Sequence, residues 1–154
     1  MQKRGNMNNY SGLLQVIKLR VCKNNRIAEN TLNNKDDQAY AVWHRIAQIY
    51  TLECVLHEYR KTNATRFVPL ENEKALHHMI LSKTNWILSE IKSLSFNECI
   101  FVIADKLTKE HMSPEAFQYI DSLGLPACSY PLDDFSEADW APGENAAFFK
   151  TLVA

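Results

Sequence analysis

Glu53 and His57 are the residues of this sequence whose types and spacing best fit acid–base chemistry. They lie four positions apart in a segment without glycine or proline, and the neighbouring apolar residues place both on the apolar side of a helix. Burial raises the pKa of a glutamate, and a histidine one turn away can share a hydrogen bond with it. The pair is therefore a candidate for acid–base catalysis. The alternatives are a satisfied structural hydrogen bond or a glutamate neutralised by an arginine.

Glu73 and His77 repeat this spacing at the start of a second predicted helix. If the two helices pack face to face, two glutamates and two histidines converge, and such a ligand set suits zinc, iron or manganese. Di-iron helical bundles space glutamate and histidine three apart, so the sequence departs from that pattern. Glu53, His57, Glu73 and His77 are candidate metal ligands, but the sequence predicts no specific cofactor.

Asp105 is a third candidate for catalysis, because it follows a presumed strand over residues 99–104. In open α/β sheets, ligands and catalytic acids collect at the carboxyl ends of strands. The alternative is that Asp105 caps the turn that follows.

Charge is distributed unevenly along the chain. Residues 1–35 carry seven basic residues and one acid, residues 36–109 are balanced, and residues 110–154 carry eight acids against Lys150. The basic start, with Lys18, Arg20, Lys23 and Arg26, could contact nucleic-acid phosphates, but Tyr10 is the one aromatic residue before Tyr40. We therefore consider a nucleic-acid partner but do not favour it.

The acidic end interleaves carboxylates with aromatic rings between Tyr130 and Trp140. Aromatic side chains surrounded by negative charges are typical of proteins that bind a basic partner rapidly and with high affinity. The alternative is that the rings fasten this loop to the core while the acids remain in water. The predicted partner-binding residues are Asp133, Asp134, Phe135, Glu137, Asp139 and Trp140.

Familiar enzyme motifs are missing from the sequence. It has no glycine-rich phosphate loop, no Gly-x-Ser-x-Gly, no His-Glu-x-x-His, and only 4 glycines. The 4 cysteines are far apart without a Cys-x-x-Cys pair, which favours buried thiols. No export signal and no run of 18 or more apolar residues is evident, so we expect a cytoplasmic protein without a membrane span.

The predicted elements begin with a frayed segment over residues 1–10 and a strand over Leu13–Cys22, where apolar and basic residues alternate. A polar connection follows over Lys23–Asn34. Caps at Asp36 and Asp37 and helical apolar spacing predict a long helix over Ala39–Tyr59, and the same spacing predicts another over Glu73–Leu94.

The last third gives mixed signals. Ser95 and Glu98 match a helix capping box, but the β-rich run Cys99–Ile103 favours a buried strand. Ser113-Pro114-Glu115 begins a helix that ends at Gly124, and Leu125–Leu132 is a predicted second strand. An acidic loop over Asp133–Gly143 and a short helix over Glu144–Val153 complete the chain.

These elements predict one domain over residues 1–154 with a helix-rich α/β fold. Two long helices would pack with a small, mainly parallel sheet of two to three strands, and the alternative is an all-α helical bundle. The favoured function is a non-catalytic protein-binding module without a cofactor, such as a bacterial inhibitor or immunity-type protein that captures a basic partner. The alternatives are a metal-dependent or acid–base enzyme and a nucleic-acid-binding protein.

Overall fold

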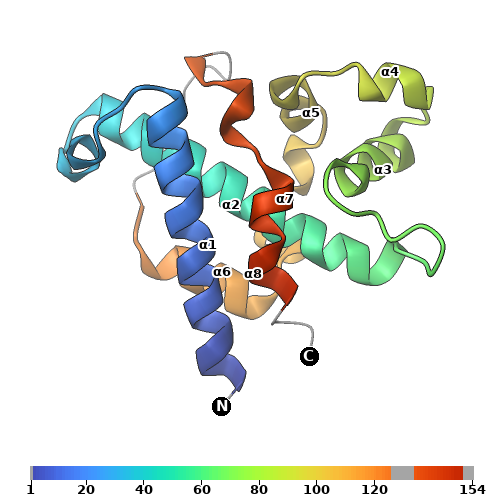
Figure 1. Ribbon diagram of the computed structural model, residues 1–154, viewed down its shortest axis with the longest axis horizontal. Helices are drawn as coiled ribbons and strands as arrows, with labels where there is room; N and C mark the ends of the chain where they lie inside the picture. Colours follow the sequence, from blue (N-terminus) through green and yellow to red (C-terminus); the bar gives the residue numbers. More distant parts are fainter. Residues whose placement is uncertain (1, 126–133, 151–154) are drawn as a thin grey trace.

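The computed structural model describes residues 2–125 and 134–150, and every regular element in these two ranges is a helix. The predicted parallel sheet is therefore wrong, and the alternative of a helical bundle fits. Figure 1 shows the long helix α2, Asp37–Asn63, crossed by α1, Gln2–Asn24, with α3 to α5 gathered towards the C-terminal end of α2.

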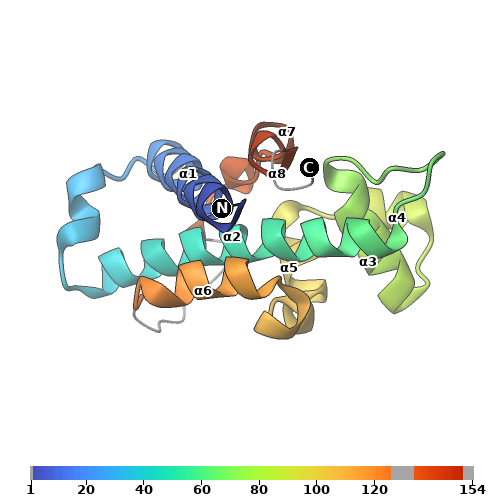
Figure 2. The same ribbon diagram turned by 90° about the horizontal axis from the view of Figure 1, so that it is seen from below.

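The central helix α2 confirms the prediction for Ala39–Tyr59 and extends it at both ends. Asp36 is its N-cap, and the Asp36 side chain accepts a hydrogen bond from the backbone N–H of Ala39 at 2.9 Å. Figure 2 shows α2 running between α1 and the C-terminal helices on one side and α6 on the other. Because α2 is covered on opposite sides, it buries residues around much of its circumference.

Helix α1 replaces the strand predicted over Leu13–Cys22, and it already includes residues 2–10, which were predicted to be frayed. Leu13, Ile17 and Val21 are four apart and fully buried, whereas Leu19, which a strand would place beside Ile17 and Val21, is 41% exposed. The apolar residues therefore follow the helical repeat, and the short alternation around Lys18 was accidental.

The polar connection predicted over Lys23–Asn34 carries a single short 3-10 helix, η1, Glu29–Asn33. Leu32 anchors η1 because its side chain is buried and its carbonyl accepts a hydrogen bond from Trp43 Nε1 at 3.0 Å.

The second predicted helix is divided into two. Helix α3, Glu73–Thr84, ends at Asn85, whose φ of 59° is left-handed, and α4, Leu88–Lys92, begins three residues later. Asparagine tolerates this conformation better than most residues, so it can end a helix as glycine does. Ile87, at the break between α3 and α4, is 66% exposed.

Helix α5, Phe96–Val102, stands where a strand was predicted over Cys99–Ile103. The capping box is formed, because Ser95 and Glu98 each accept a hydrogen bond from the other's backbone N–H. Phe96, Cys99, Ile100 and Ile103 are buried at helical spacing and leave Phe101 exposed. The local capping signal therefore outweighed β-propensity. The 3-10 helices η2, Ala104–Lys106, and η3, Lys109–His111, follow.

Helix α6, Pro114–Ser122, confirms the predicted start, with Ser113 as its N-cap. Gly124, with φ of 58°, lies two residues after its end as predicted. The second predicted strand, Leu125–Leu132, lies outside the described residues apart from Leu125.

The C-terminal segment crosses back over α1 and α2 through η5, Glu137–Asp139, α7, Pro142–Asn145, and α8, Ala147–Lys150. Helices α7 and α8 stand where one short helix was predicted over Glu144–Val153. Gly12 permits the close crossing of α1 and α8, since a Cβ there would lie 2.8 Å from Phe148 Cε1.

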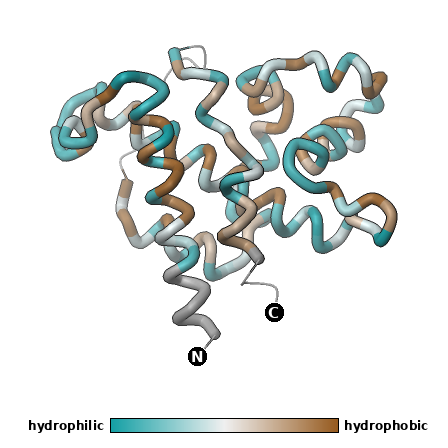
Figure 3. Tube along the Cα trace, viewed as in Figure 1, coloured by the Kyte–Doolittle hydropathy of each residue, from teal (hydrophilic) through white to brown (hydrophobic). Residues whose placement is uncertain are grey.

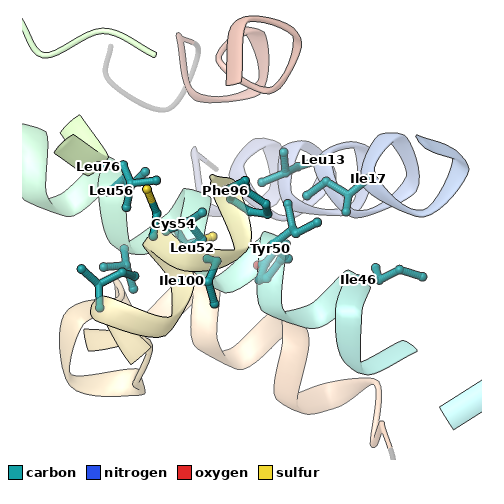
Figure 4. Close-up of a cluster of buried hydrophobic side chains, with 14 of the residues drawn as sticks. Leu13, Ile17, Ile46, Tyr50, Leu52, Cys54, Leu56, Leu76, Phe96 and Ile100 are labelled. Carbon is teal, nitrogen blue, oxygen red and sulfur yellow. The ribbon is translucent and has the colours of Figure 1, made fainter. Parts of the chain in front are cut away.

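The core is continuous along α2. Figure 4 shows Leu13 and Ile17 of α1 beside Tyr50 of α2, with Phe96 and Ile100 of α5 in the same cluster. Figure 3 colours the middle of α1 as hydrophobic where it crosses α2. Among the helices of the described ranges, none is long and apolar enough to cross a membrane.

Candidate functional site

Glu53 lies in the core rather than in an open catalytic pocket. Its side chain accepts hydrogen bonds from Trp140 Nε1 at 3.0 Å and from Asn145 Nδ2. Burial raises the pKa of Glu53, and these two hydrogen bonds, together with the charge of Arg60, only partly oppose the rise. Glu53 therefore ties the C-terminal segment to α2.

His57 is one turn further along α2, but the structure shows no hydrogen bond between it and Glu53. Its ring stacks on Phe149 with centroids 4.5 Å apart. Burial, followed by the charge of Lys61, lowers the pKa of His57 to about 4. The neutral ring acts here as an aromatic surface, and the acid–base pair predicted for these two residues is not formed.

The predicted metal ligands do not converge. Glu73 is exposed at the start of α3, and His77 is half-buried, with a pKa that burial lowers. Among the residues that the structure describes, no group of three or more histidine, cysteine, aspartate or glutamate side chains could hold a metal ion. The enzyme hypothesis remains a prediction without an assembled site.

Asp105 lies in η2 after a helix, so the expectation of a carboxylate at a strand end was wrong. It is exposed and forms an ion pair with Lys83, which also donates to the carbonyl of Val102. The hydrogen bond that Lys83 donates to the Asp105 carboxylate is the main cause that lowers the pKa of Asp105. The two side chains join α3 to the end of α5.

Three of the predicted partner-binding residues are held within the fold. Asp139 is fully buried against Arg45, Phe135 is buried, and Trp140 is half-buried. The guanidinium of Arg45 lies over the Phe135 ring at 5.5 Å from its centroid, and Trp140 stacks on Phe96 at 5.2 Å. These three side chains anchor the C-terminal segment.

Asp134 and Glu137 remain on the surface, and Asp133 lies outside the described residues. Glu137 accepts a hydrogen bond from the backbone N–H of Asn97 at 3.1 Å. Asn97 Nδ2 also donates to the carbonyl of Phe135. Glu137 and the backbone of Phe135 therefore lie beside the first turn of α5.

The basic start of the chain is partly neutralised within the molecule. Arg20 forms an ion pair with Glu144 at 2.8 Å, and its side chain is only 10% exposed. Lys18 is half-buried, while Lys23 and Arg26 are exposed. The nucleic-acid hypothesis remains a prediction.

Phe101, an aromatic side chain that is 78% exposed on α5, is not among the functional residues predicted from the sequence. As part of a strand it would have been a core residue. The capping box at Ser95 and Glu98 was the signal that could have revealed it, because a helix starting there buries Cys99 and Ile100 and turns Phe101 outward. Glu98 is exposed one turn before Phe101 on the same helix.

Glu98, Phe101 and Glu137 define an α5 surface, and Asp134 is a further exposed acid of the segment that supplies Glu137. Burial, followed by the charges of Glu98 and Glu137, raises the pKa of the Cys99 thiol to about 11, so both carboxylates act on the same turn of α5. Two acids and one exposed ring are thus contributed by two segments far apart in the sequence. No protein-family model, no curated protein and no solved structure matches this chain.

Proposed function

We propose that this protein is a non-catalytic binding module that captures a basic protein partner through the α5 surface, in the manner of an inhibitor or immunity-type protein. The observation that carries this proposal is the exposure of Phe101 on the helix that also presents Glu98 and contacts Glu137. A large ring among carboxylates fits a partner that offers an apolar pocket with lysine or arginine at its edge.

Phe101 supplies the apolar contact. A phenylalanine side chain moved from water into a protein contact contributes roughly 1.5–3 kcal/mol, so one ring in a well-fitting pocket can dominate a small interface. The Phe101 ring gains little of this burial energy within the chain, because it is one of the most exposed large apolar side chains of the described residues.

Two carboxylates of the surface are held in place before any partner arrives. Glu98 accepts a hydrogen bond from the backbone N–H of Ser95 at 2.8 Å, and Glu137 accepts one from Asn97. Groups that are already ordered lose less conformational entropy when they bind. Their charge also speeds the approach of a basic partner at low salt.

Lys83 lies at the C-terminal end of α5 and is already paired within the chain. Lys83 is engaged by Asp105 and by the carbonyl of Val102. A cytoplasmic location is part of the same proposal, and it is supported by the free, buried thiols of Cys22, Cys54 and Cys99, which suit a reducing compartment.

The test is capture of a partner from the native cell by the wild-type protein and by Phe101→Ser. Phe67→Ser is the matched control, since Phe67 is 87% exposed in the loop before α3. We expect a basic protein that is retained by the wild type and the control and is lost with Phe101→Ser. An acidic or neutral partner, or one that Phe101→Ser retains fully, would overturn the proposal.

A further inference from the structure

A pocket of about 320 Å³ opens towards the C-terminal end of α2, and none of the residues that line it belongs to the α5 surface. It is bounded by His57, Arg60 and Lys61 of α2, by residues 71–72 before α3, and by Ala146 and Phe149 of the C-terminal segment. This volume is at the lower end of the range of about 300–1,000 Å³ that is typical of small-molecule sites.

One wall of the pocket is apolar. The His57 ring stacks on Phe149, and Ala146 lies beside them. Because burial and Lys61 lower the pKa of His57 to about 4, the imidazole is neutral near pH 7 and presents a flat, uncharged face. The Phe149 side chain is 6% exposed, so it is a fixed part of this wall.

Arg60 supplies a positioned cation at the same pocket. Its Nε donates to the carbonyl of Leu70 at 2.7 Å, and its Nη2 donates to the carbonyl of Asn72 at 3.0 Å. Leu70 and Asn72 have backbone φ angles of 59° and 55°, values that residues other than glycine rarely adopt. Strained backbone of this kind is often found beside ligand sites, and here it holds the guanidinium against the pocket.

Among the residues that bound the pocket, Arg60 and Lys61 are basic. Lys61 pairs with Glu58 one turn away, but that pair is exposed and therefore weak. Glu71 is the one acid among the residues that bound the pocket. Glu53, the buried acid whose charge acts on Arg60, has a pKa that burial raises, which favours its neutral form.

We infer that this pocket binds a small organic acid whose carboxylate contacts Arg60 and Lys61 and whose apolar body packs against Phe149 and His57. Carboxylates match the guanidinium group in geometry as well as in charge. The pocket and the α5 surface share no residue, so a test that disproves ligand binding in the pocket leaves the proposed partner binding unaffected, and the reverse also holds.

The test uses benzoate and phenylacetate as probes and benzylamine as the charge-reversed control, with dissociation constants from calorimetry and binding sites from amide NMR shifts. We expect both acids to bind, with shifts at residues 57–61 and 146–149, and benzylamine to bind at least about tenfold more weakly. Equal binding of benzoate and benzylamine, or shifts confined to other residues, would overturn the inference.

Two variants and a control locate the site. Lys61→Gln should weaken benzoate binding about threefold to tenfold, because it removes a cation at the edge, whereas Lys74→Gln on the exposed part of α3 should leave it unchanged. Ala146→Phe should fill the pocket and abolish binding. If Ala146→Phe does not fold, Lys61→Gln decides alone, and benzoate affinity equal to that of the wild type would contradict the inference.

Discussion

Asp139 and Arg45 form a fully buried ion pair, with 3.0 Å between Asp139 Oδ2 and Arg45 Nε. Asn24 and Asn25 also donate to Asp139, and Arg45 Nη2 donates to the carbonyl of Ser136 at 3.0 Å. Both charges are thus neutralised and hydrogen-bonded inside the protein. This arrangement joins the C-terminal segment to α1 and α2, which are more than 90 residues away in sequence.

Asp139→Asn should destabilise the protein by about 3 kcal/mol, because it leaves the Arg45 charge buried without its counter-ion. Urea denaturation near pH 7 measures the change. Glu137→Gln is the control, since Glu137 is exposed and a glutamine can still accept from Asn97. A loss below about 1 kcal/mol for Asp139→Asn would show that the pair does not hold the segment in place.

The sequence was sufficient to predict α2, α6 and the start of α3, because Asp36, Ser113 and helical apolar spacing are local signals. It was not sufficient for α1 and α5. Over a few residues, Ile17 to Val21 and Cys99 to Ile103 fit a strand as well as a helix. Burial against distant segments decided for a helix in α1, and the capping box at Ser95 and Glu98 decided for one in α5.

The candidate sites were harder to predict for the same reason. Asp139 carries a charge in a polar loop, which normally indicates exposure, and its partner Arg45 is 94 positions away. Glu53 was expected to be desolvated, as it is, but its partners Trp140 and Asn145 come from the far end of the chain. Helical periodicity predicts on which face of a helix a residue lies, but it does not predict which segment of the chain packs against that face.

Glu53→Gln should retain the fold and change the pH dependence of stability. The folded-state pKa of Glu53 is raised above its ordinary 4.5, so the contribution of Glu53 to stability is fully present below pH 4.5 and is lost as pH rises through the folded pKa. The Glu53→Gln variant does not lose this contribution, because glutamine does not titrate. Its amide can also donate to Asn145 Oδ1, which is buried without a partner, once the Asn145 amide turns.

We expect Glu53→Gln to be within roughly 1 kcal/mol of the wild type near pH 7, or more stable. The free energy of unfolding, measured by urea at several pH values from 4.5 to 8, provides the comparison. A large loss of stability with an unchanged pH slope would indicate that Glu53 is charged in the folded protein.

His57→Phe should protect the protein against mild acid. The folded-state pKa of His57 is about 4, against an ordinary 6.5, so below pH 6.5 the unfolded chain takes up a proton that the folded protein does not. The wild type therefore loses stability as pH falls from 6.5 towards 4, and His57 has no such effect above pH 6.5. Phenylalanine preserves the stack on Phe149 and does not titrate.

The measurement is the thermal midpoint of both proteins between pH 4 and 7. The difference in favour of His57→Phe should grow as pH falls. Parallel curves for the two proteins would show that the imidazole is as easily protonated in the fold as in the unfolded chain.

The association rate of the captured partner, measured at low and at high salt, tests the role of the α5 surface most directly. Glu98→Gln with Glu137→Gln keeps both hydrogen-bond acceptors while removing two charges, and Glu29→Gln with Asp121→Asn removes two exposed charges elsewhere. We predict that the first pair slows association about tenfold at low salt and little at high salt, and that the second pair does not. Equal rates for both double variants, or a rate that salt does not affect, would contradict capture through this acidic surface.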